Sequence, residues 1–192
     1  MLHTTFCNLF GLTYPIMNAP MAGTGGGQLA GAVSAVGGLG MIGGSSRVSG
    51  MSTEDWLRRE IQVVRTMTDR PFGVGFISTA RSAPDGRLQA EALQNVALDE
   101  GVRIIAHSFT VPGHLISQAR NRGARVICQV QTVAMAHEAV AAGADVLVAQ
   151  GFDGGGHVGS IGTLSIVPSI IDVAGDLPVL AAGGIADGRG LA

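Results

Sequence analysis

One histidine stands in an unusually glycine-rich stretch of the sequence. Residues 150–159 read QGFDGGGHVG, in which five of ten positions are glycine and His157 is the single histidine. Glycine is favoured where the backbone needs a positive φ or where another group must come close to it. A histidine side chain titrates near neutral pH and can accept or donate a proton. The stretch predicts a loop in which His157 acts on a bound molecule; an exposed histidine without a role is the alternative.

The composition excludes several other kinds of site. The 192 residues include no lysine, which rules out a lysine Schiff base and a P-loop. The formal net charge of −2 gives no electrostatic reason to expect nucleic acid. Cys7 and Cys128 are far apart and no carboxylates cluster near His157, so no metal site is predicted. We expect neither a membrane span nor a secretory signal, and a cytoplasmic location with both thiols free.

Short apolar runs alternate with helical patterns along the whole chain. Such runs, without polar alternation, are typical of strands buried on both faces of a parallel sheet. They favour a single α/β domain over residues 1–192, a TIM (β/α)₈-type barrel rather than an open doubly wound sheet. We expect seven strands, with the eighth βα unit missing. The seven runs are Pro15–Ala19, Leu39–Gly43, Phe72–Ile77, Arg103–His107, Arg125–Val130, Asp145–Ala149 and Pro178–Ala182.

Local signals place several helix ends. Ser52 has the side chain of an N-cap and precedes a segment with helical periodicity, and a second helical segment, Thr132–Ala142, follows a possible N-cap. Gly101, Gly123 and Gly143 each stand between a helical pattern and an apolar run. A glycine at the C-terminus of a helix, followed at once by a strand, is the usual junction of a βα repeat. These positions therefore support the repeated βα architecture.

In TIM barrels the active site is built from the loops that follow the strands. His107 ends the fourth predicted strand, where it faces the pocket or has a structural role. Gln129 and Gln131 follow the fifth predicted strand, and the glycine-rich stretch of His157 follows the sixth. The seventh is followed by Gly183–Gly184, where barrels often bind phosphate on backbone N–H groups. A plain tight turn is the alternative there.

Five stretches of the chain resemble the nitronate monooxygenase family, formerly called 2-nitropropane dioxygenases, and the related FMN-dependent enoyl-ACP reductases. They follow the order of the family and span nearly the whole chain. The two last stretches are the more specific. The stretches are Pro15–Gly23, Pro71–Ile77, Ser108–Phe109, Ala149–Gly159 and Pro178–Gly190.

The resemblance implies an FMN-containing TIM barrel with His157 as the catalytic histidine. The family usually has asparagine where this chain has Gly75, which offers the flavin only its backbone. The family also completes its phosphate site with a loop after the eighth strand, which we expect to lie outside this chain. The cofactor-binding residues that the resemblance implies are Asn18, Ala19, Pro20, Met21, Gly75, Gln150, Gly155, Gly183 and Gly184.

The activity that the resemblance implies is oxidation of nitronates or nitroalkanes to carbonyl compounds and nitrite with O₂. His157 would deprotonate a neutral nitroalkane and, when protonated, steady the anionic nitronate. NAD(P)H-dependent reduction of an enoyl-ACP or a quinone on the same fold is an alternative, and an inactive truncated remnant is another. The expected partners are a small-molecule substrate and O₂, with a homo-oligomer as an open possibility and neither nucleic acid nor a membrane.

Overall fold

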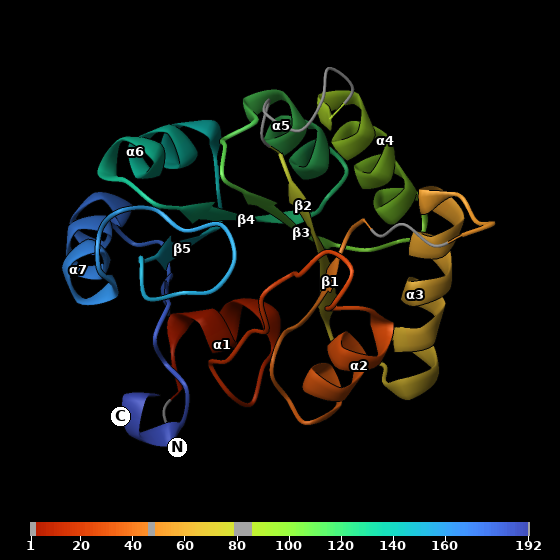
Figure 1. The fold of residues 1–192 in the computed structure, drawn as a ribbon, viewed down its shortest axis with the longest axis horizontal. Helices are drawn as coiled ribbons and strands as arrows, with labels where there is room; N and C mark the ends of the chain where they lie inside the picture. The colour runs from red at the N-terminus through yellow and green to blue at the C-terminus, as the bar shows by residue number, and fades with distance from the viewer. Residues whose placement is uncertain (1–2, 46–48, 79–85, 192) are drawn as a thin grey trace.

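The structure, a computed structural model, describes residues 3–45, 49–78 and 86–191. Its centre is one parallel sheet in which each strand pairs with the next along the chain. The sheet curves into about half of a barrel (Figure 1). Its strands are β1 (Gly40–Gly43), β2 (Phe72–Ile77), β3 (Ile104–Ser108), β4 (Arg125–Val130), β5 (Val146–Gln150) and β6 (Val179–Ala182).

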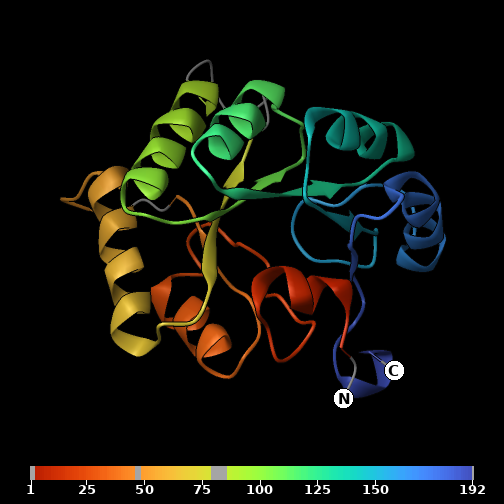
Figure 2. The same ribbon diagram turned by 180° about the vertical axis from the view of Figure 1, so that it is seen from behind.

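Most helices cover the outer face of the sheet. Figure 1 shows α3 to α7 in an arc outside the strands, and Figure 2 shows the same arc from behind. Buried side chains between the two layers, such as Leu57, Val74 and Ile105, form the larger of two apolar clusters. The helices are α1 (Thr5–Phe10), α2 (Gly27–Ala35), α3 (Thr53–Met67), α4 (Gly86–Asp99), α5 (Gly113–Asn121), α6 (Val133–Ala142), α7 (Thr163–Ala174) and α8 (Gly188–Leu191).

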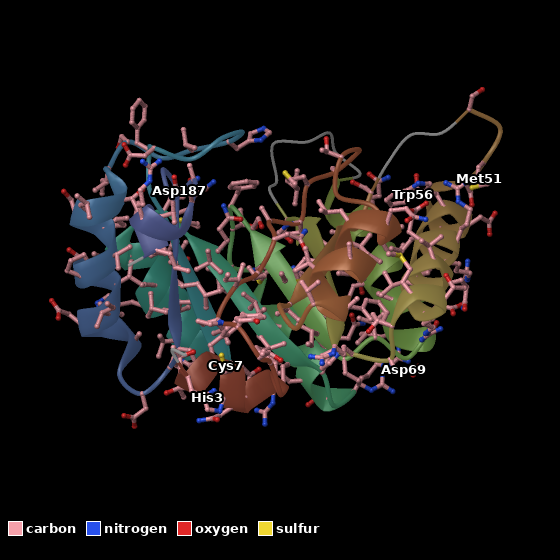
Figure 3. The ribbon with its side chains drawn as sticks, turned by 90° about the horizontal axis from the view of Figure 1, so that it is seen from below. His3, Cys7, Met51, Trp56, Asp69 and Asp187 are labelled. Carbon is pink, nitrogen blue, oxygen red and sulfur yellow. The ribbon has the colours of Figure 1, made fainter. Side chains whose placement is uncertain are left out.

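Helix α1 closes one end of the barrel interior. Phe6, Cys7 and Phe10 are buried and belong to a second apolar cluster, together with inward-facing strand residues such as Met41 and Ile104. Figure 3 shows Cys7 at the same end of the molecule as Asp69, which lies just before β2. This end therefore holds the amino ends of the strands, and the opposite end is left for a site.

The prediction of seven strands was wrong, because the segment Pro15–Ala19 makes only an isolated parallel bridge, from Met17 to Leu39. The next hydrogen bonds to β1 are made by the side chain of Asn18 and not by its backbone. Its Nδ2 donates to the carbonyl of Met41 at 2.9 Å and its Oδ1 accepts from the Met41 N–H at 2.8 Å. Pro15, at the start of this segment, and Pro20, directly after it, lack the N–H that a strand needs. The segment therefore lies where a strand would, without forming one.

The predicted helix ends are confirmed at Ser52 and at the three glycines, whereas Thr132, expected within a helix, is itself the N-cap of α6. Ser52 Oγ accepts from the Asp55 N–H at 3.1 Å, and Thr132 Oγ1 accepts from the Met135 N–H at 3.1 Å, so both residues are N-caps. The glycines at the three helix-to-strand junctions, Gly101, Gly123 and Gly143, have φ values of 81°, 77° and 90°. Residues with a Cβ are disfavoured in this region, which explains glycine at these junctions.

Both cysteines are free and buried. Burial, and next the negative charge of Asp145, raise the pKa of the Cys128 thiol to about 12. Since the thiolate is the reactive form of cysteine, Cys128 is inert at neutral pH.

No helix in the described ranges is long and apolar enough to cross a membrane.

Candidate active site

A cavity of about 370 Å³ opens at the carboxyl ends of the strands. Figure 3 shows Met51 and Asp187, which follow β1 and β6, at the end of the molecule opposite Cys7 and Asp69. Small-molecule sites usually measure roughly 300 to 1,000 Å³. Six of the predicted site residues line the cavity: Ala19, Pro20, Met21, Gln150, Gly155 and His157.

The cavity is mainly apolar. Ala106, Ile127 and Val148, one from each of β3, β4 and β5, contribute its inner wall. They belong to the interior cluster that rests on α1. Among the lining residues that the structure describes, His157 alone carries an imidazole, a carboxyl or a basic group. Among these residues His157 is therefore the candidate for general acid–base chemistry.

His157 is exposed and faces the ring of Phe109. The two ring centroids are 5.3 Å apart and the rings are inclined at 45°. Phe109 has a φ of 72°, in a region where a bulky residue is rare. Such strain costs about 1 to 3 kcal/mol and persists where the surroundings enforce it, often at functional sites. The turn after β3 thus presents an aromatic ring to the imidazole.

The loop that carries His157 is held at its base. The N–H of Phe152 donates to the carbonyl of Ile161 at 2.7 Å. Asp153 Oδ2 accepts from the N–H of Thr163 at 2.7 Å, at the first residue of α7. The Thr163 backbone hydrogen bond holds the pKa of Asp153 below its usual range. Because its two ends are joined, the glycine-rich segment between them can project over the cavity.

Three glutamines meet beside this loop, at the carboxyl ends of β4 and β5. Gln150 Oε1 accepts from Gln131 Nε2 at 2.8 Å and also from Gln129 Nε2. Gln131 Nε2 is 3.0 Å from the backbone carbonyl oxygen of His157. Gln150 is 9% exposed, so its amide group lies largely inside the protein. The network links a residue of the cavity wall to the His157 loop.

Two predicted residues, Asn18 and Gly75, contact residues next to the cavity or in its wall but do not line the cavity themselves. The amide of Asn18 is engaged with Met41, as described above. A Cβ atom on Gly75 would lie 2.4 Å from the ring of Pro20, so the absence of a side chain lets Pro20 pack against β2. Neither Asn18 nor Gly75 is among the residues that line the cavity. Their contact with a flavin stays a prediction.

Gly183 and Gly184 form a turn after β6, with φ values of 121° and 74°. Within the described residues, neither N–H donates a hydrogen bond. A Cβ atom on Gly183 would lie 2.6 Å from Thr163 Oγ1 and 2.9 Å from the Gly154 nitrogen. The position therefore requires glycine, and it leaves two N–H groups free for an anion such as a phosphate.

His107 does not line the cavity. It is fully buried, and its Nδ1 lies 2.8 Å from Ser78 Oγ. Ser108, the next residue, lines the cavity, so His107 points to the opposite face of β3. Burial, and next the charge of His114, lower the pKa of His107 to about 4. Of the two roles left open by the sequence, the structure supports the structural one.

The link between Gln131 and Gln150 was missed by the sequence analysis. The pairing of β4 with β5 sets Gln129 opposite Val148 and Val130 opposite Ala149, so Gln131 comes beside Gln150. Successive strand residues alternate between the two faces of a sheet, so Gln129 and Gln131 share a face. Aligning the two predicted strands in parallel could therefore have found the pair.

Comparison with known proteins gives a family for this arrangement. The nitronate monooxygenase family model matches residues 3–192. The chain is 36% identical to the (3aS,4S,5R,7aS)-5-hydroxy-7a-methyl-1-oxo-octahydro-1H-indene-4-carboxyl-CoA dehydrogenase of Mycobacterium tuberculosis, in a match that covers 100% of the chain and 51% of that relative. The chain spans about half the length of this relative and of a second one from Rhodococcus jostii.

Solved structures show the same fold. FabK from Thermotoga maritima superposes with a TM-score of 0.87 at 36% identity, over 100% of this chain and 57% of FabK. A nitroalkane oxidase from Streptomyces ansochromogenes superposes with a TM-score of 0.77 at 30% identity, over 95% of this chain and 61% of the oxidase. The half-barrel thus corresponds to part of their larger structures. Because the family model matches nearly the whole length of this chain, the chain belongs to the nitronate monooxygenase family.

Proposed function

We propose that the protein is an FMN-dependent oxidoreductase that oxidises nitronates or nitroalkanes to carbonyl compounds and nitrite. The observation that carries this proposal is the placement of His157. Its imidazole projects over a cavity whose wall is otherwise apolar or uncharged. A nitroalkane has a small alkyl group that suits such a wall and an acidic C–H that needs one base. The similarity to a nitroalkane oxidase at 30% identity supports the same reading.

The cavity and the glycine turn fit FMN. The Ala19–Met21 turn and Gln150 would meet the ring system, and Gly155 leaves open space beside it, because a Cβ there would touch nothing within 4 Å. The free N–H groups of Gly183 and Gly184 would hold the phosphate. When bound, FMN supplies the acceptor for the substrate electrons, which pass on to O₂.

The contribution of this chain to the reaction is positioning and proton control. The neutral imidazole of His157 accepts the proton from the carbon next to the nitro group, and the resulting imidazolium lies close to the anionic nitronate. The ring of Phe109 limits how the imidazole can turn, since the two rings are in contact range. The apolar wall excludes water from the alkyl part of the substrate.

A reaction on thioesters is a second candidate, because the chain is 36% identical to a dehydrogenase that is named for a carboxyl-CoA substrate. The same cavity is open at the rim, where a long substrate could extend to the solvent. In this case His157 would transfer a proton at the carbon next to a thioester carbonyl. NAD(P)H consumption in the absence of oxygen, with an enoyl thioester or a quinone as acceptor, separates this activity from nitroalkane oxidation.

His157→Asn is the test of the proposed function. Unaltered protein should show the visible spectrum of bound flavin and should release nitrite from a nitroalkane. The variant should keep the flavin spectrum and lose about 100-fold or more of nitrite release, as expected when a general base is removed. Preformed nitronate should be affected less than the neutral nitroalkane. Undiminished turnover of the nitroalkane would remove His157 from the mechanism, and a colourless unaltered protein would contradict FMN binding.

A further inference from the structure

The orientation of the Gln150 amide can be deduced from its neighbours. The carbonyl oxygen of His157 can only accept hydrogen bonds, so the Gln131 atom at 3.0 Å from it must be the nitrogen, Nε2. This same nitrogen lies 2.8 Å from a terminal atom of Gln150, which must therefore be the oxygen. A single backbone carbonyl thus decides which way both amide groups point.

The free end of Gln150 is consequently a donor. Its oxygen is occupied by Gln131 and Gln129, and its Nε2 makes no hydrogen bond within the described residues. Gln150 lines the cavity, and its Nε2 lies beside Gly154, at 3.5 Å from where a Cβ of Gly154 would be. An uncharged, unpaired N–H₂ group on a residue of the cavity wall suits a ligand that offers a ring carbonyl or a ring nitrogen as acceptor.

We propose that Gln131 is a positioning residue, which fixes Gln150 as a hydrogen-bond donor to the flavin ring and ties this contact to the loop of His157. The inference rests on the proposed function as far as the flavin is concerned. Its second part, the tie between Gln131 and the loop, depends only on the hydrogen bond from Gln131 to the His157 carbonyl. Through this tie, flavin binding and the position of the catalytic imidazole depend on one side chain.

The two donors to Gln150 are not equivalent. Gln129 bonds to Gln150 but makes no hydrogen bond to the His157 loop. An amide without a second fixed partner can turn over and exchange donor for acceptor, so Gln129 alone leaves the orientation of Gln150 undetermined. Gln131 has its own orientation fixed by the His157 carbonyl. Removing Gln131 and removing Gln129 should therefore have different results.

The experiment compares Gln131→Glu and Gln131→Met with the matched control Gln129→Met. A carboxylate at residue 131 faces two oxygens, so Gln150 should turn its N–H₂ toward it and present oxygen to the cavity. Titration of apoprotein with FMN, followed by flavin fluorescence, should show about 10-fold weaker binding for Gln131→Glu, as lost and opposed hydrogen bonds imply. The absorption maxima of bound flavin should shift as well. Gln129 lines the cavity itself, so Gln129→Met serves as the control for loop exchange and not for FMN affinity.

Hydrogen exchange of residues 151–162 gives a readout that needs no flavin. Both Gln131 variants should exchange faster in this loop than the unaltered protein, whereas Gln129→Met should not. Equal FMN affinity, equal spectra and equal loop exchange in Gln131→Glu and unaltered protein would overturn the inference, as would an equal effect of Gln129→Met on loop exchange. If unaltered protein takes up no FMN, the proposed function fails with the flavin contact, and loop exchange still decides the tie between Gln131 and His157.

Discussion

The two ends of the half-barrel are built on opposite principles. At the amino ends of the strands, α1 seals the interior with Phe6 and Phe10, whose side chains are 3% and 7% exposed. At the carboxyl ends, glycine turns and an exposed histidine surround an open cavity. One end is close-packed and apolar, and the other leaves backbone N–H groups, amide groups and an imidazole available.

The amino ends of the strands therefore contribute mainly to the stability of the fold, and the carboxyl ends mainly to the proposed chemistry. The packed apolar side chains of the interior cluster, two of them phenylalanines, stabilise the fold without reference to a ligand. The loops around the cavity bury little apolar surface. Their conformation depends on individual hydrogen bonds such as those of Asp153 and Gln131. Substitutions at the two ends should therefore change different measured quantities.

The largest effect on stability is expected at the sealed end. Phe6→Ala should lower the free energy of unfolding by about 3 to 5 kcal/mol, the usual cost of truncating a buried phenylalanine. Urea denaturation followed by circular dichroism measures this loss. The fraction of the protein that remains folded should bind FMN as tightly as unaltered protein. A variant with normal stability and impaired FMN binding would break the division between the two ends.

A smaller effect depends on pH and comes from His107, on the outer face of β3. Its folded-state pKa is lowered from 6.5 to about 4, so between these values the unfolded chain binds a proton that the folded chain does not. Stability is therefore fully present above pH 6.5 and falls as the pH drops toward 4, by about 3 kcal/mol in all.

Urea denaturation at pH 7 and at pH 4.5 tests this expectation. His107→Asn should be less dependent on pH than unaltered protein, because asparagine does not titrate. His157→Asn is the matched control at the exposed histidine and should keep the dependence. The same pH dependence in all three proteins would exclude His107 as its source.

The smallest effect is expected in the glycine-rich loop. Gly156 has a φ of 77°, whereas Gly155 does not have a positive φ, and a Cβ atom on either would touch nothing within 4 Å. Gly156→Ala should therefore cost about 1 to 2 kcal/mol through backbone strain alone, and Gly155→Ala should cost almost nothing. Measurements on apoprotein by urea denaturation compare the two. A larger loss in Gly155→Ala would mean that the loop packs more tightly than the structure shows.

Much of the fold could be predicted because its signals are local. Ser52 marks a helix start by its side chain, and Gly143 marks a helix end by the backbone conformation that it permits. The segment Pro15–Ala19 was wrongly predicted as a strand, because an apolar run does not reveal which hydrogen bonds its backbone makes. The amide of Asn18 replaces a step of the ladder, and this depends on where β1 lies in space.

The site was predicted only in part for a similar reason. His157, Gln150 and the Ala19–Met21 turn were placed at the cavity by their position after predicted strands and by the family resemblance, and the structure brings them together. The left-handed conformation of Phe109 runs against the preference of its residue type, so no local signal announces it. It follows from contacts that the complete fold imposes.

The burial of both thiols has a consequence for a protein that would work with oxygen. Peroxide formed as a by-product attacks thiolates, but Cys7 and Cys128 are enclosed, and Cys128 remains protonated far above neutral pH. The sulfur most open to damage at the cavity is instead the thioether of Met21, at a residue that is 39% exposed. At the cavity, oxidation should thus produce a sulfoxide of Met21 and not a disulfide cross-link.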